Sequence, residues 1–235
     1  MGPDRVAAML ARGPSLERRA LHEEVAERLR ELITEGRLEP GARLNERLLC
    51  EGLGVSRTPL REAFKSLAAE RLIELTPNRG ARVIVLSEAS IRELFELMGA
   101  LEGLSGQLAA ERRTPADRRR IRRLHEQMLD AHASGELPAY YRLNREIHEA
   151  INRCARNAEL TETYRAVNTR IQNLRFRSNF NQSKWDQAVR EHERMLAFLD
   201  AGDSIALRAE LERHLGHKCD AVLEGLRSAA AGAGR

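Results

Sequence analysis

Four side chains in the second half of the sequence have types and spacings that suit a metal ion. Asn144 and His148 are four residues apart, so in a helix they project from one face. His192 lies ten residues before Gly202, and His214 lies twelve residues after it. If Gly202 joins two antiparallel helices, a rise of about 1.5 Å per residue brings these two imidazoles to nearly the same level. Three neutral imidazoles and an oxygen ligand suit a divalent ion, with zinc or nickel favoured and positions left open for water or a ligand.

The same histidines also have a simpler interpretation. A single histidine is more often hydrogen-bonded in the core or at the surface than bound to a metal ion. Four further histidines show no comparable arrangement: His22, His125, His132 and His217. The paired spacing strengthens the metal interpretation, but the residues alone leave both open.

A second group of residues, in the first half, is typical of a nucleic-acid reader. Arg57 and Arg61 share one face of a helix predicted over residues 57–70, and guanidinium groups there can pair with guanine in the major groove. Ser56 and Thr58 supply hydroxyls for phosphate oxygens beside the N–H groups of the helix N-terminus. These four side chains could also do no more than solvate an exposed helix face.

Two neighbouring segments favour DNA binding over that alternative. Arg47, on the preceding predicted helix, is placed to touch the flanking DNA backbone. Arg79 and Gly80 lie in a predicted turn, whose tip would meet the minor groove or phosphates. A helix, a turn and a basic hairpin therefore occur in the order that groove reading requires.

The elements that would position these residues fall into two sets. Apolar periodicity predicts three helices and then two β-prone runs, at residues 16–35, 45–52, 57–70, 72–76 and 81–85. This is the plan of a winged helix-turn-helix with a small β-hairpin wing. Everything after Ser87 is predicted to be helical, at residues 88–112, 115–133, 137–153, 157–178, 184–201 and 203–228. We therefore expect a mostly α protein, in which an all-helical antiparallel bundle follows the winged helix-turn-helix.

The change of pattern after residue 86 marks the expected domain boundary. We expect a disordered N-terminal extension over residues 1–15, a DNA-binding domain over 16–86, a helical domain over 87–228 and a flexible tail over 229–235.

Composition excludes several other classes of protein. The 235 residues are 42% hydrophobic with a formal net charge of only +4, which excludes intrinsic disorder for most of the chain. No apolar run reaches 18 residues, as a transmembrane helix would require, and the N-terminal residues lack the apolar core of a signal peptide. Three widely spaced cysteines form neither a disulfide framework nor a zinc knuckle. We expect a cytoplasmic protein.

Three motifs carry a resemblance to a known family. They are Leu38-x-Pro40-Gly41-x-x-Leu44, Gly54-Val55-Ser56-Arg57-Thr58-Pro59-x-Arg61-Glu62-Ala63 and Arg79-Gly80-Ala81-x-Val83. Over about residues 16–86 the chain thereby resembles the GntR family of bacterial transcription regulators. The resemblance implies that operator DNA is contacted by Arg47, Ser56, Arg57, Thr58, Arg61 and Gly80, to which we add Arg79 because of its charge and position.

The helical half carries a weaker resemblance. Asn144-x-x-x-His148, Glu191-His192 and His214 are similar to motifs of the FCD effector domain, found in the FadR-type branch of that family. The resemblance covers about residues 88–226. It implies that Asn144, His148, His192 and His214 bind a divalent metal ion, which helps to hold a small carboxylate effector.

Two residues depart from the FCD pattern. Asn144 replaces the commoner aspartate and removes one negative charge from the site. Met98 stands where many relatives have an arginine that pairs with the effector carboxylate. Candidates for a replacement partner are Arg145, Arg170, Arg175 and Arg177.

These features lead to one main hypothesis and two alternatives. The main hypothesis is a ligand-responsive transcription regulator, a repressor that binds a palindromic operator as a homodimer and responds to a metabolite such as an organic acid. One alternative is a direct metal sensor, in which the ion itself is the signal. The other is a metal-dependent enzyme built on the helical bundle, but no positioned general base stands out, so we expect no enzymatic activity.

Overall fold

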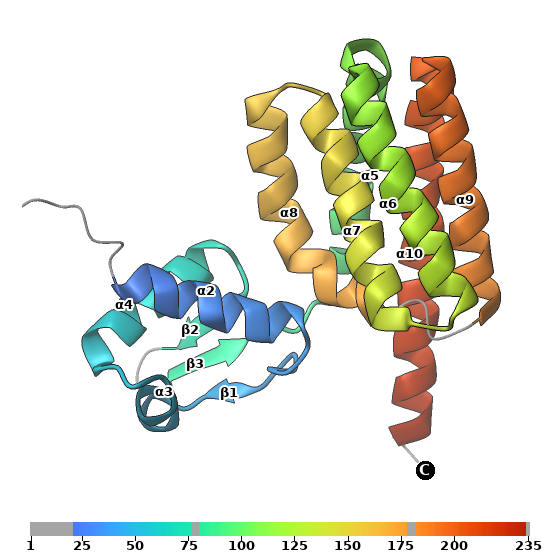
Figure 1. The fold of residues 1–235 in the computed structure, drawn as a ribbon. Helices are drawn as coiled ribbons and strands as arrows, with labels where there is room; N and C mark the ends of the chain where they lie inside the picture. The colour runs from blue at the N-terminus through green and yellow to red at the C-terminus, as the bar shows by residue number, and fades with distance from the viewer. Residues whose placement is uncertain (1–20, 77–79, 178–181, 234–235) are drawn as a thin grey trace, which may run out of the picture.

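The computed structural model describes residues 21–76, 80–177 and 182–233, and only the backbone of residues 173, 175–177, 182–183 and 229–233. Arg79 and the expected N-terminal extension lie outside the described residues. The described chain is mostly helical, with a winged helix-turn-helix followed by a helical bundle (Figure 1). The fold class expected from the sequence is confirmed.

The N-terminal unit consists of three helices and a three-stranded antiparallel sheet. Its elements are α2 (Leu21–Thr34), β1 (Arg43–Leu44), α3 (Glu46–Leu53), α4 (Arg57–Ala69), β2 (Ile73–Thr76) and β3 (Gly80–Val83). The strand order is β1-β3-β2, and Ala81 pairs with Leu44 on one side and Leu75 on the other. The sequence analysis missed β1, because two residues are too few to show an alternating pattern.

Apolar residues at helical spacing bind this unit together. Leu29 of α2 and Leu60 and Leu67 of α4 are fully buried, and they pack with Ile73 and Val83 of the sheet. Each helix therefore presents one apolar face to the core and leaves its opposite face to solvent.

The turn between α3 and α4 is determined by its end residues. The Asn45 side chain caps α3 by accepting hydrogen bonds from the N–H groups of Arg47 and Leu48, as expected for an N-cap. Gly54 ends α3 in the left-handed region, at φ 67°, where glycine has no steric penalty. The chain can then change direction in the three residues between α3 and α4, which leaves the N-terminus of α4 accessible.

The second unit is a bundle of helices. They are α5 (Glu88–Arg112), α6 (Pro115–Ala133), α7 (Leu137–Cys154), α8 (Ala158–Arg177), α9 (Gln182–Ala201) and α10 (Ser204–Ala233). Ser87 caps α5, and Thr114 and Asp117 form a reciprocal capping box on α6. Helix α10 continues past residue 228, where we expected a tail to begin, because Ala and Gly alone do not stop a helix that is already packed.

Two contacts matter for the arrangement of these helices, one between α5 and α10 within the bundle and one between α8 and the N-terminal unit. Helices α5 and α10 run side by side, and a Cβ on Gly106 would overlap Leu211 Cδ1, so glycine permits their close approach. Helix α8 faces the N-terminal unit and contacts α2 (Figure 1). Within the described residues, no helix is both long and apolar enough to cross a membrane.

Candidate metal centre and DNA-reading surface

Three histidines from three helices meet inside the bundle. His148 of α7, His192 of α9 and His214 of α10 are each at most 2% exposed, and their ring centroids are 5.0–5.3 Å apart. A ring nitrogen from each residue lies within 4.8 Å of the other two, close enough for one ion to bind all three. Helices α9 and α10 are joined at Gly202, as expected, and this connection explains why His192 and His214 lie at the same height along the two helices.

Two buried carboxylates orient these imidazoles. Glu102 Oε2 lies 2.7 Å from His148 Nδ1, and Glu191 Oε2 lies 2.6 Å from His214 Nδ1. A metal-ligating histidine characteristically donates its second ring N–H to a carboxylate, which directs the other nitrogen at the metal. Here that nitrogen is Nε2 of His148 and of His214.

The sequence analysis quoted Glu191 within a motif but assigned no role to it or to Glu102. Glu102 lies four residues after Met98 on a helix face that is buried and mostly apolar. An acidic residue on such a face needs a buried partner, and this signal could have identified it.

His192 differs from the other two histidines. Neither of its ring nitrogens has a hydrogen-bond partner, although the side chain is 1% exposed. Burial, followed by the neighbouring His148 and His214, holds the pKa of His192 well below its ordinary value. The ring is therefore neutral, which is the form that binds a metal ion.

Asn144 precedes His148 by one helical turn and lies on the same buried face of α7. It is 6% exposed, and its Oδ1 has no hydrogen-bond partner. An orphaned amide oxygen beside buried imidazoles is consistent with the oxygen ligand expected from the sequence.

A cavity of about 380 Å³ has Asn144, one helical turn before His148, in its lining. Asn144, Arg142 and Arg145 of α7 line one side of it, and α8 lines another. Thr34 and Glu35, at the end of α2, also reach it, so both units of the protein contribute to its wall.

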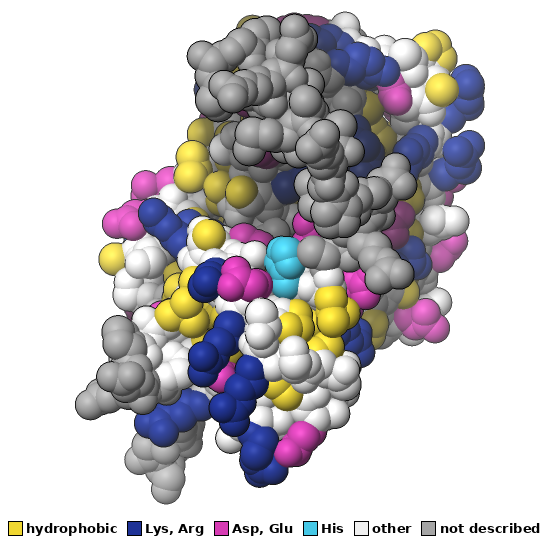
Figure 2. All heavy atoms as spheres, turned by 90° about the vertical axis from the view of Figure 1, so that its left-hand side faces the viewer, with side chains coloured by type: hydrophobic (Ala, Val, Ile, Leu, Met, Phe, Trp, Pro, Cys, Tyr) yellow, Lys and Arg dark blue, Asp and Glu magenta, His cyan; other side chains and the backbone are white. Residues whose placement is uncertain are grey.

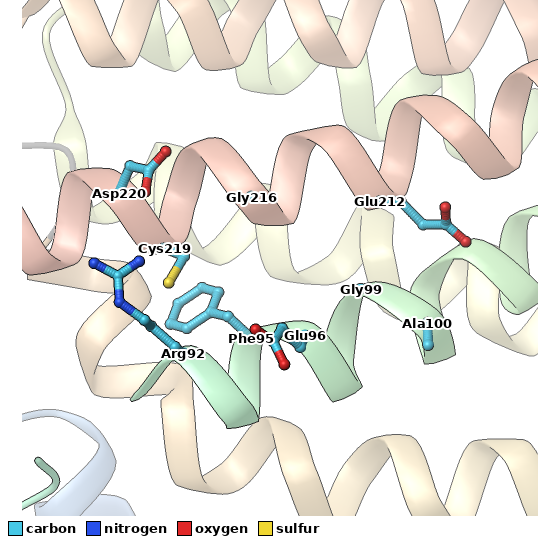
Figure 3. A pocket seen from close by; sticks show the side chains of 9 residues that line it. All are labelled: Arg92, Phe95, Glu96, Gly99, Ala100, Glu212, Gly216, Cys219 and Asp220. Atoms are coloured by element: carbon cyan, nitrogen blue, oxygen red, sulfur yellow. The ribbon is translucent and has the colours of Figure 1, made fainter. Parts of the chain in front are cut away.

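A second hollow, of about 430 Å³, lies between α5 and α10 (Figure 3). Its charged lining consists of Arg92 and three carboxylates, Glu96, Glu212 and Asp220. This excess of negative charge disfavours an anionic ligand, whereas the cavity beside Asn144 has two arginines and one glutamate.

The four arginine candidates for an effector partner lie in different places. Arg145 lines the cavity beside Asn144, and Arg170 lines a separate cavity between the two units. The side chains of Arg175 and Arg177 lie outside the described residues. Met98 is fully buried among apolar side chains, so its position serves the core of the bundle.

The proposed DNA-reading residues that the structure describes are exposed on the N-terminal unit. Arg57, Thr58 and Arg61 are exposed at the start of α4, and the Ser56 hydroxyl makes no capping hydrogen bond. Arg61 forms an exposed ion pair with Glu46 at 3.1 Å, an interaction weak enough to be exchanged for DNA.

Arg47 follows Glu46, the partner of Arg61, so it lies close to this helix end. Arg47 of α3 is 68% exposed and pairs with Glu51 on its own helix. Gly80 is exposed at the start of β3 with φ 83°. Figure 2, which views the molecule from the side of this unit, shows Lys and Arg side chains gathered on its surface.

Comparison with known proteins agrees with this division. Residues 21–83 match the family model described as bacterial regulatory proteins of the gntR family, and residues 93–217 match the FCD domain model. The chain is 33% identical over 218 residues to the Glc operon transcriptional activator of Escherichia coli, covering 82% of this chain and 85% of the relative. It is 30% identical over 183 residues to the probable D-xylose utilization operon transcriptional repressor of Paenarthrobacter nicotinovorans, covering 78% and 80%.

Among solved structures, E. coli McbR/YncC is similar over 87% of this chain and 98% of its own, with a TM-score of 0.76 and 25% identity. A transcriptional regulator from Rhodococcus sp. RHA1 shares the fold, with a TM-score of 0.72 over 86% of this chain and 97% of its own, at 24% identity.

Proposed function

Because the chain belongs to the GntR family of bacterial transcription regulators and carries an FCD domain, we propose that it is a homodimeric, metal-containing repressor released by a small carboxylate. The family and the similar proteins are transcription regulators, so the metal-dependent enzyme considered above is excluded. The proposal assigns DNA binding to residues 16–86 and effector binding to residues 87–228, with the chain acting in the cytoplasm on operator DNA.

The observation that carries DNA binding is the exposed N-terminal end of α4. Arg57 and Arg61 project from its outer face, while Leu60 and Phe64 on the inner face are buried. The core thus holds the helix rigidly and leaves two guanidinium forks to reach base edges. Ser56 supplies a hydroxyl for phosphate at the same helix end.

The flanking contacts come from Arg47, Thr58, Arg79 and Gly80. Two copies related by a two-fold axis would place two such helix ends on a palindromic site.

The metal proposal depends on the chemistry of the donor set. Three imidazoles, two of them paired with buried carboxylates, fit zinc or nickel better than magnesium or calcium, which prefer oxygen ligands. His148, His192 and His214 would supply nitrogen and Asn144 would supply oxygen. Bound there, the ion would act as a Lewis acid that holds a carboxylate oxygen of the effector.

The cavity beside Asn144 is the proposed effector site. Its arginines, Arg142 and Arg145, supply a positive charge for the effector, which the arginine that many relatives have in place of Met98 would otherwise supply. Arg142 is already paired with Glu146 at 2.8 Å, whereas Arg145 lies 3.9 Å from Glu149, so Arg145 is the more available partner for a carboxylate. Since Thr34 and Glu35 share the wall, an effector bound there would bias the placement of the DNA-binding domain.

The test of DNA binding is selection of sheared host DNA at about 150 mM salt, where non-specific binding is weak. The parent protein is expected to enrich a palindromic motif that the double variant Arg57→Ala/Arg61→Ala does not enrich, because each arginine contributes about 1–3 kcal/mol to a specific site. The matched control is Arg119→Ala/Arg120→Ala, which removes two exposed arginines from α6. Equal enrichment by all three proteins would refute the groove assignment.

The same assay tests the roles of metal and effector. Repeating it with zinc, with a chelator and with small carboxylates separates the two signals. Release of DNA by a carboxylate supports the repressor; tighter binding would identify an activator. A response to metal with no organic ligand present would favour the direct metal sensor.

A further inference from the structure

A small cavity lies at the junction of the two domains, apart from the histidine cluster. It has a volume of about 110 Å³, comparable to the liquid volume of three to four water molecules. The DNA-binding domain contributes the end of α2, the turn after α4, and the end of β3 with the residues that follow it. The helical domain contributes α8 and the neighbouring ends of α5 and α10. Most of its lining is apolar, including Ile33, Leu72, Ile91 and Leu174.

The charged lining of this cavity consists of two arginines, one from each domain. Arg71 follows α4 and Arg170 belongs to α8. None of the described residues that line the cavity is Asp or Glu.

The Arg170 guanidinium lacks a counter-charge in the described part of the chain. Its Nε is buried and has no hydrogen-bond partner. Burial, followed by the charge of Arg71, lowers the pKa of Arg170 below its ordinary value. A guanidinium with a buried, unpaired donor is destabilising unless an anion joins it.

Arg71 is itself held in an unusual conformation. Its φ is 57°, in the left-handed region that favours glycine at the end of a helix. A side chain placed at such a backbone position has a cost, and such positions concentrate at functional sites. Here the side chain is a guanidinium that shares a cavity with Arg170.

We propose that this cavity binds a short-chain monocarboxylate, held by Arg71 and Arg170 together and distinct from the effector beside Asn144. A guanidinium fork matches a carboxylate geometrically, and the apolar lining accepts the alkyl chain. The volume admits an anion the size of acetate or propionate.

The position of this cavity gives the anion a specific consequence. Because one guanidinium comes from each domain, the anion binds well only when the domains are arranged as in Figure 1. The bound anion therefore favours that arrangement of the domains. By linkage, the factor by which the anion changes the protein's affinity for operator DNA equals the factor by which operator DNA changes its affinity for the anion. This regulatory consequence depends on the proposed function, whereas anion binding does not.

The test is calorimetric titration of the full-length, metal-loaded protein with sodium propionate. Arg170→Gln is expected to weaken propionate binding at least about tenfold, because it removes a charge-assisted, bidentate contact. The matched control Arg165→Gln, an exposed position five residues earlier on α8, is expected to bind like the parent. Equal affinity of the parent and Arg170→Gln would overturn the proposal.

Further variants keep the test decisive. Arg71→Gln is expected to show the same loss, so the proposal remains testable if Arg170→Gln does not fold. If Arg145→Gln abolishes propionate binding and Arg170→Gln does not, the anion occupies the cavity beside Asn144 and the proposal is wrong. Tighter binding of phosphate or chloride than of propionate would overturn the carboxylate class.

Operator binding is measured in parallel. A protein that binds propionate through Arg170 but enriches no DNA motif would refute the proposed function and leave this site standing.

Discussion

Substituting Glu102 by glutamine should weaken zinc binding while leaving the fold intact. Glu102 Oε2 lies 2.7 Å from His148 Nδ1, and both side chains are at most 3% exposed. The carboxylate pairs with Nδ1, and such a pairing directs Nε2 at the metal and makes it more basic. Glutamine keeps the size of the side chain but loses the charge, so the imidazole becomes a poorer and less firmly oriented ligand.

The expected loss of affinity follows from that geometry. Removing one such carboxylate partner typically weakens metal binding about 10–100-fold, or roughly 1.4–2.7 kcal/mol. Because the contact is buried from water, we expect little compensation by solvent. Loss of the ligand itself, in His148→Ala, should have a larger effect than Glu102→Gln.

The assay is competition for zinc between the purified protein and a chromophoric chelator at neutral pH. Glu96→Gln is the matched control, since Glu96 is an exposed glutamate on the same helix and forms no ion pair with a histidine among the described residues. The reasoning is refuted if Glu102→Gln and Glu96→Gln bind zinc as tightly as the parent. Circular dichroism of each variant checks that a lost affinity does not reflect a lost fold.

Two further predictions concern stability, both measured by denaturant unfolding. Gly106→Ala should destabilise the bundle by about 1–2 kcal/mol, since overlap with Leu211 outweighs the gain in helix propensity, whereas Gly216→Ala, with open space at its Cβ, should stabilise it by up to about 1 kcal/mol. A Gly106→Ala variant that is as stable as the parent or more stable would show that α5 and α10 approach each other less closely than described. Arg156 and the N-cap of α6 lower the pKa of Asp117 from 3.8 to about 2. Its contribution is therefore complete above about pH 4 and is lost as the pH falls toward 2. Asp117→Asn should cost about 1 kcal/mol at neutral pH, a value reduced for its partial exposure, and the difference from the parent should shrink between pH 4 and pH 3. A difference that does not change with pH would contradict the assigned cause.

Local patterns in the sequence were sufficient to predict most of the fold. Apolar residues at helical spacing predicted the helices of both domains. The structure shows that local residues also bound α3, since the Asn45 side chain caps its start and Gly54 ends it in the left-handed region. These features depend on neighbours within a few residues, and the sequence displays such neighbours directly. The short strand β1 was missed because it exists only by pairing with β3.

The candidate sites divide in the same way. The sequence by itself determined that Asn144 and His148 share a helix face and that His192 and His214 can meet across a turn, because helical geometry converts spacing into direction. Only the tertiary structure decided that α7, α9 and α10 bring the three imidazoles within reach of one ion, and that Glu102 of α5 lies behind one of them. Arg71 and Arg170 likewise line one cavity only because of how the two domains dock. Side chains far apart in the chain meet through packing of whole helices, and no local pattern encodes the register of that packing.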